Sequence, residues 1–173
     1  MISRIYVTPK ENVKTALSYL FDSKLSKKEI IKLTEALTNP ILEDYFINES
    51  PDFRSFDYAV EIGFLPGVTD NVGRTVEEIT KDLLHLKKDL DIKVYTSKIF
   101  LFHKSNLNIQ EQASALYNPL IERVLIVSVK NGKINLPNKI PKVVLQKNKP
   151  VLNVSLAVSD EELVRIGTEG IVG

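Results

Sequence analysis

One eight-residue motif occurs twice in this chain. Residues 36–43 read ALTNPILE, and residues 115–122 read ALYNPLIE, 79 positions later without a gap. A repeat at a fixed spacing is typical of one supersecondary unit that is used twice. We therefore expect two related halves, and 173 residues are enough for one large domain or two small ones.

The second half begins with a strand pattern and a helix pattern. Residues 56–64 alternate between apolar and other side chains, which predicts a half-buried strand. Pro66 and Gly67 then predict a turn. Asp70 or Asn71 can cap a helix. The apolar stripe of this helix comprises Val72, Val76, Ile79, Leu83 and Leu86.

A second strand, a second helix and a closing strand complete this half. Residues 94–102 are rich in aromatic and β-branched side chains and predict a strand. Asn108 predicts the start of a helix that buries Ile109, Ala113 and Leu116. Asn118 and Pro119 end that helix near Tyr117, because the residue before a proline disfavours the α region. Residues 120–129 then predict the closing strand, which gives the order β-α-β-α-β.

The first half repeats only part of this order. Ser26 and Glu29 predict a capping box, and Asn39 with Pro40 ends the helix before a strand at residues 41–47. The strands predicted at residues 5–7 and 16–21 are separated by a segment that is too short for a helix of several turns. We therefore predict that the first half has lost or shortened its first helix.

These patterns predict a two-layer α/β (α+β) fold built from tandem ferredoxin-like β-α-β-α-β units, the first of them reduced. We place the first unit at residues 1–50 and the second at 51–129. Residues 130–173 form an extended linker, or a segment laid along a surface, that ends in a short helix. Residues 130–149 carry six lysines and no acidic residue, whereas Ser159 and Glu162 predict the cap of the last helix.

The residues offer little catalytic chemistry. The chain has no cysteine, which excludes thiol catalysis and thiolate-bound metal within it. His85 and His103 have no partner at metal-ligand spacing, and the glycines match no phosphate-binding motif. The helix start near Asp70 could hold an anion, but its carboxylate would repel one, so a structural role is the favoured interpretation. We predict no catalytic, cofactor-binding or metal-binding residue.

The charge and the hydropathy of the chain limit its expected partners and location. The net charge is +1, so the overall charge does not point to nucleic acid. The lysine-rich segment lacks arginine and aromatic residues, which disfavours base stacking. No apolar run has the length of a transmembrane helix. We expect a soluble cytoplasmic protein without nucleic-acid or membrane partners.

The second half resembles PurS, the small subunit of phosphoribosylformylglycinamidine synthase (formylglycinamide ribonucleotide amidotransferase). Residues 65–73 (LPGVTDNVG) are similar to that family's K-P-G-V-x-D-x-x-G signature, through Pro66, Gly67, Asp70 and Gly73. Both repeats resemble its second signature, L-L-x-N-P-x-I-E, through the pairs Asn39-Pro40 and Asn118-Pro119. Residues 158–163 (VSDEEL) resemble the approach to the synthetase portion of single-chain versions with a fused PurS-like module.

This resemblance implies a covalent pseudo-dimer without catalytic residues of its own. PurS works as a dimer that bridges a glutaminase and an ATP-dependent synthetase, so that ammonia from glutamine reaches formylglycinamide ribonucleotide. The implied partners are those two components, as domains or subunits, and ATP and magnesium belong to the synthetase. Self-association is left open. The implied role is a non-catalytic assembly module of purine biosynthesis, a ligase component that makes no product alone.

An alternative reading is a ferredoxin-like regulatory module that binds a small metabolite at the junction of its two units. A third reading, an independent enzyme, is the least favoured, because no motif predicts a cluster of perturbed ionisable groups.

Overall fold

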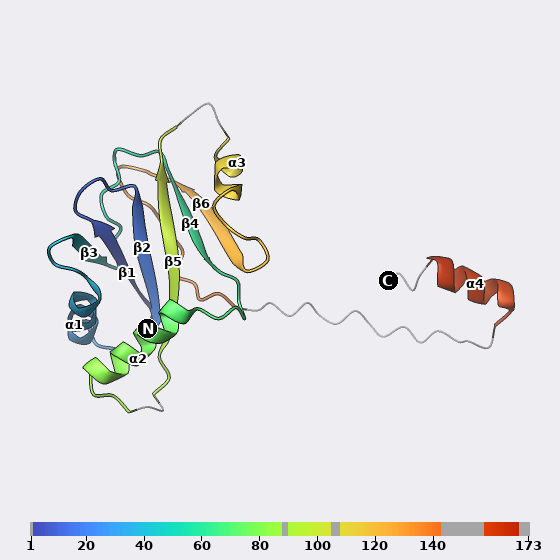
Figure 1. Ribbon diagram of the computed structural model, residues 1–173, viewed down its shortest axis with the longest axis horizontal. Helices are drawn as coiled ribbons and strands as arrows, with labels where there is room; N and C mark the ends of the chain where they lie inside the picture. Colours follow the sequence, from blue (N-terminus) through green and yellow to red (C-terminus); the bar gives the residue numbers. More distant parts are fainter. Residues whose placement is uncertain (1, 88–89, 105–107, 143–157, 170–173) are drawn as a thin grey trace. The chain divides into compact units, whose positions relative to one another are not determined.

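The computed structural model describes residues 2–87, 90–104, 108–142 and 158–169. It divides into two units, Met1–Lys142 and Val143–Gly173, which are described separately. The first unit holds a single sheet with helices on one face (Figure 1). In the second unit, the described residues 158–169 contain the helix α4 (Asp160–Glu169), which begins where the sequence predicts the last helix.

Six strands form one antiparallel sheet in the order β3-β1-β2-β5-β4-β6. The predicted α+β fold, with helices packed on a sheet, is confirmed. The strands are β1 (Ile2–Pro9), β2 (Thr15–Asp22), β3 (Glu43–Ile47), β4 (Tyr58–Phe64), β5 (Lys93–Phe102) and β6 (Glu122–Ser128). The strands predicted at residues 41–47 and 120–129 are therefore shorter than expected, because each begins only after its Asn-Pro turn.

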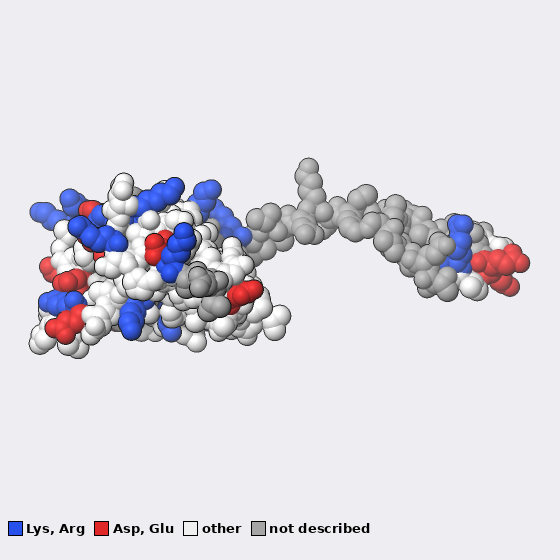
Figure 2. Space-filling view, turned by 90° about the horizontal axis from the view of Figure 1, so that it is seen from above, with Lys and Arg blue, Asp and Glu red and all other residues white. Residues whose placement is uncertain are grey.

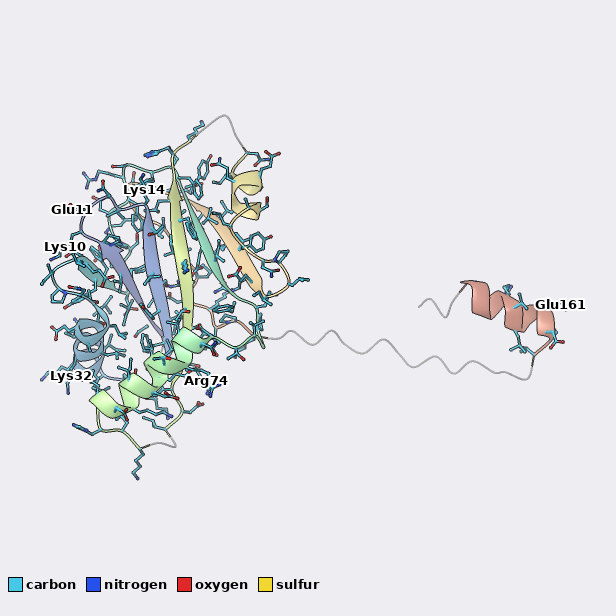
Figure 3. All side chains as sticks on the ribbon, viewed as in Figure 1. Lys10, Glu11, Lys14, Lys32, Arg74 and Glu161 are labelled. Carbon is cyan, nitrogen blue, oxygen red and sulfur yellow. The ribbon has the colours of Figure 1, made fainter. Side chains whose placement is uncertain are left out.

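Three helices belong to the first unit: α1 (Lys27–Leu37), α2 (Asn71–Leu83) and α3 (Ile109–Ser114). The capping box of Ser26 and Glu29 is present at α1, and Asn108 caps α3. Only residues 10–14 connect β1 to β2, so no helix lies between these two strands. Lys10, Glu11 and Lys14 lie on this connection (Figure 3).

Alternate side chains of each strand point to the same face of the sheet, and the helices cover one of the two faces. On that face α1 and α2 pack over β1, β2 and the first part of β5, whereas α3 packs over β4 and β6. Two apolar clusters result, one containing Phe21 and Leu33 and the other containing Val60 and Ala113.

The opposite face of the sheet is covered by chain without regular secondary structure. Phe53 precedes β4, and Ile134 and Leu136 follow β6; all three are buried against Tyr6 and Ile99 of the sheet. The start of the lysine-rich segment is thus laid along this surface, and residues 143–157 lie outside the described residues. The predicted boundaries at residues 50 and 129 fall between β3 and β4 and just after β6, and they stay predictions.

Two helix patterns differ from their predictions. The buried face of α2 consists of Gly73, Val76 and Thr80. Val72 and Ile79 lie outside this face and are exposed. Helix α3 ends at Ser114, so Leu116 is outside the helix and exposed rather than buried. The apolar stripes are therefore wider than the face that the first unit itself covers.

At the centre of the sheet, β2 lies beside β5. Ser18 of β2 and Ser97 of β5 are direct cross-strand partners, and they are 79 residues apart, the spacing of the repeated motif. To the left of this pair the order is β3-β1-β2, and to the right it is β5-β4-β6.

The face of the first unit shown in Figure 2 carries basic and acidic side chains interspersed. Within the described residues, no helix combines the length and the apolar character that a membrane crossing requires.

Candidate functional site

The two copies of the repeated motif form turns with matching hydrogen bonds. In the first copy, Asn39 Oδ1 accepts from the Ile41 amide at 3.0 Å. The Asn39 carbonyl oxygen accepts from Leu42 at 3.1 Å and from Glu43 at 2.8 Å. The Asn39 amide in turn donates to the Glu43 carboxylate at 2.8 Å. The asparagine and the glutamate therefore close the turn from both ends.

The second copy reproduces all four bonds. Asn118 Oδ1 accepts from Leu120 at 3.0 Å, and the Asn118 carbonyl accepts from Ile121 at 3.1 Å and Glu122 at 2.8 Å. The Asn118 amide donates to the Glu122 carboxylate at 2.7 Å. The asparagine and the glutamate, which are identical in both copies, are thus the residues whose hydrogen bonds close the turn.

Each turn is also tied to the end of a neighbouring strand. The Lys10 amide, after β1, donates to the Leu42 carbonyl at 2.9 Å, and the Leu65 amide, after β4, donates to the Ile121 carbonyl at 2.9 Å. The residues of the two Asn-Pro motifs and of the Pro-Gly turn therefore lie at two separate strand ends. Asn39 and Pro40 lie beside the end of β1. Pro66, Gly67, Asn118 and Pro119 lie beside the end of β4.

Asp70 and Gly73 fix the start of α2 against β5. Asp70 Oδ1 accepts from the Gly73 amide at 2.7 Å, and Asp70 Oδ2 accepts from the Thr96 amide at 2.6 Å. A side chain at Gly73 would collide with the Val94 carbonyl oxygen. Gly67 has φ of +89°, which suits the turn before the helix. The Asp70 carboxylate occupies the helix start where an anion would bind, so these residues hold structure together.

The structure adds a groove that the sequence did not predict. It has a volume of about 470 Å³ and lies on the helix-covered face, between α2 and the turn that precedes β6. Its apolar lining comprises Leu17, Ile62, Phe64, Val72, Phe100 and Leu116. Val72 is 54% exposed, and Leu17 and Leu116 are each 39% exposed, so exposed large apolar side chains gather on this concave surface, as they do at interaction sites.

A lysine lies in the middle of this apolar lining. Lys98 is an exposed residue of the central strand β5, and its cross-strand neighbours are Leu17 and Ile62. Among the described residues, no carboxylate oxygen lies within 4.0 Å of its ammonium group. Glu122 also lines the groove, but its carboxylate accepts a hydrogen bond from the Asn118 amide. An apolar groove with one free cation is the best candidate binding surface in the described part of the chain.

The opposite face of the sheet carries a buried ion pair that the sequence analysis missed. Arg4 Nη1 lies 2.6 Å from Glu61 Oε1, and the two residues are 2% and 1% exposed. Ser18 accepts a hydrogen bond from Arg4 at 2.8 Å, and Ser97 donates to Glu61 at 2.7 Å. In the sequence, Arg4 and Glu61 appear only as single charged residues within the segments of β1 and β4. Alternation alone does not tell whether such a residue is buried or exposed.

The ion pair also anchors the segment after β6. Arg4 Nη2 donates to the Pro137 carbonyl at 2.9 Å, and Arg4 Nε donates to Asn138 Oδ1 at 3.1 Å. Arg123 of β6 lies 3.8 Å from the second Glu61 oxygen. The cluster therefore joins both halves of the sheet to the covering chain, and its burial fits a structural role.

The two histidines do not form a site. His85 follows the end of α2 in the left-handed region, with φ of 52°, and His103 stacks on Phe56 with ring centroids 4.8 Å apart. In residues 2–87, 90–104, 108–142 and 158–169, no three acidic or histidine side chains are grouped as metal ligands.

The chain matches no protein-family model, no curated protein and no solved structure.

Proposed function

We propose that this chain is a non-catalytic assembly module of phosphoribosylformylglycinamidine synthase. It would organise the ATP-dependent synthetase and the glutaminase so that ammonia reaches formylglycinamide ribonucleotide in the cytoplasm. The proposal begins from the resemblance of residues 65–73 and of the two Asn-Pro motifs to the PurS signatures. ATP and magnesium would be bound by the synthetase component.

One observation carries the proposal furthest. The two motifs form turns with the same four hydrogen bonds, and the 79-residue spacing between them is also the spacing of the central pair Ser18 and Ser97. Two similar halves joined at antiparallel strands are what fusion of a symmetric dimer would produce. We interpret the sheet as such a pseudo-dimer, with ferredoxin-like halves of which the first lacks one helix.

The test uses the full chain with a synthetase and a glutaminase that have no PurS-like module of their own. We expect a complex in analytical ultracentrifugation and a gain in glutamine-dependent product formation. Ammonia-dependent turnover by the synthetase should change less, because the module serves the connection between the components. If the chain neither binds nor raises glutamine-dependent turnover, the proposal is wrong.

A second candidate function is supported by the groove beside β2 and β5. Its 470 Å³ are within the usual range for a small-molecule site, and it lies at the junction of the two halves. A metabolite-binding regulatory module would use Lys98 for a carboxylate or phosphate. Thermal unfolding with nucleotides and amino acids separates the two candidates, because a ligand that binds the folded state raises its melting temperature.

A further inference from the structure

The 79-residue spacing relates positions on the helix-covered face of β2 to positions on β5. Because Ser18 pairs with Ser97 in an antiparallel register, a two-fold rotation about this pair exchanges each β2 residue with the β5 residue 79 positions later. Tyr19 then corresponds to Lys98, and Phe21 corresponds to Phe100.

The two sets of positions differ in what covers them. Tyr19 and Phe21 are buried in one cluster with Val76 of α2, and Tyr19 also lines the groove. Burial raises the pKa of Tyr19, and the Glu43 and Asp70 carboxylates raise it further. Their counterparts line the groove, where Lys98 is exposed and Phe100 is half-buried.

The groove is thus the place of a helix that the first half does not have. Helix α2 arises in the connection between β4 and β5, whereas β1 and β2 are joined by residues 10–14 alone. In Figure 1, α2 crosses one end of β2 and β5, and no described helix crosses their other end. A helix of the length of α2, 13 residues, is about 20 Å long.

The chemistry of the groove defines what would fit it. Leu17, Val72 and Leu116 expose apolar surface, so an occupant gains from burying its own apolar side chains there. Lys98 would become a buried unpaired cation under an apolar occupant, which is costly, so the occupant needs an acidic side chain opposite it. An amphipathic helix with one acidic residue within its apolar stripe meets both requirements.

We propose that the groove binds an amphipathic helix of the synthetase component, with an acidic residue paired to Lys98 and apolar residues on Leu17 and Phe100. This inference rests on the proposed function, which makes the synthetase a partner of this chain. A second copy of the chain fits less well. A symmetric contact through this groove would bring two Lys98 ammonium groups towards each other without a carboxylate between them.

The first test compares the affinity of full-length variants for the isolated synthetase. Lys98→Glu should raise Kd at least about tenfold, because a like-charge contact replaces the ion pair, whereas Lys98→Arg should retain binding. Leu17→Asp should weaken binding by about tenfold through the apolar contact. Lys28→Glu is the matched control, since Lys28 is exposed on α1 and the charge change is the same. Circular dichroism melts verify that each variant is folded.

The outcomes separate the two proposals. If the wild-type chain binds the synthetase and the groove variants bind equally well, the docking site is elsewhere and the proposed function stands. If the wild-type chain does not bind, the proposed function fails and the docking inference fails with it.

A cross-link identifies the occupant directly. The photoreactive residue p-benzoylphenylalanine, introduced at position 17 of the full chain, should react with a synthetase helix that has an acidic residue between apolar ones. A cross-link to the glutaminase, to a second copy or to α4 of the same chain would overturn the inference. Absence of any cross-link in a complex shown to form would overturn it as well.

Discussion

At the residue scale, Asp70 joins two elements that are distant in sequence. Its carboxylate accepts from the Gly73 amide at the start of α2 and from the Thr96 amide of β5, 26 residues later. Thr96 also donates its hydroxyl to Asp70, at 2.9 Å. Val94 has a similar arrangement, because its amide donates to Glu77 of α2 at 3.0 Å. These amides lie beyond the stretch of β5 that pairs with β4, so α2 and its cap residue Asp70 supply the acceptors that a neighbouring strand would otherwise provide.

Gly73 is the position where a methyl group is least tolerated. We expect Gly73→Ala to lower the free energy of unfolding by about 1–3 kcal/mol, although alanine favours helix formation, because its Cβ would collide with the Val94 carbonyl and lie 2.9 Å from Asp70 Cγ. Urea unfolding measures the change. Arg74→Ala, at the next and exposed helix position, is the control. Equal stability of the two variants would show that α2 can move away from β5 at little cost.

At the element scale, local sequence decides where each helix begins. At α1 the Ser26 hydroxyl accepts from the Glu29 amide, and the Glu29 carboxylate accepts from the Ser26 amide at 2.7 Å. At α3 the first contact is made by Asn108, which accepts from the Gln110 amide at 3.0 Å. These contacts span two or three residues, so they can be predicted without knowledge of the fold.

The capping box should make the stability of the first unit depend on pH. Hydrogen bonds from the Ser26 hydroxyl and amide lower the pKa of Glu29 below its ordinary 4.5. A lowered pKa stabilises the folded state above the ordinary value, and this contribution is lost as the pH falls through the lowered one. The stability difference between the wild type and Glu29→Gln should therefore be present near neutral pH and vanish in acid.

Urea unfolding at a series of pH values tests this dependence. Glu35→Gln is the matched control, because Glu35 is exposed on the same helix. A difference between wild type and Glu29→Gln that is the same in acid and at neutral pH would contradict the assignment of the capping carboxylate.

At the scale of the whole molecule, the buried ion pair connects parts that lie far apart in sequence. Arg4 belongs to β1, Glu61 belongs to β4, and Arg4 also holds Pro137 and Asn138 after β6. Both halves of the sheet and the chain that covers them therefore depend on one cluster. A buried charge without its partner is strongly destabilising.

Removing both charges of this pair should cost less than the two single losses added together. We expect Arg4→Met or Glu61→Gln alone to lower the unfolding free energy by about 3–5 kcal/mol. The double variant should lose less than the sum of the two, because neither charge is then left unpaired. A double-mutant cycle by urea unfolding measures this coupling. Strictly additive losses would mean that the two side chains contribute independently.

Sequence reasoning was most successful where the contacts are local. The alternation in β4, the turn at Pro66 and Gly67 and the short connection after β1 were predicted from neighbouring residues. It was less successful for Leu116, which was predicted to be buried and is exposed. Val72 belongs to the predicted apolar stripe of α2, and it is exposed as well. A periodic apolar pattern tells which side chains share a face of a helix, but not whether another element covers that face.

The repeated motif shows the same division. The sequence by itself determined two Asn-Pro turns, each followed by a strand, because asparagine, proline and glutamate act within five positions of one another. Only the tertiary structure decided that Ser18 and Ser97 meet at the centre of one sheet, that Arg4 and Glu61 pair beneath residues 137 and 138, and that Lys98 lies in an apolar groove. These arrangements depend on the order and register of strands from distant segments, which local preferences do not encode.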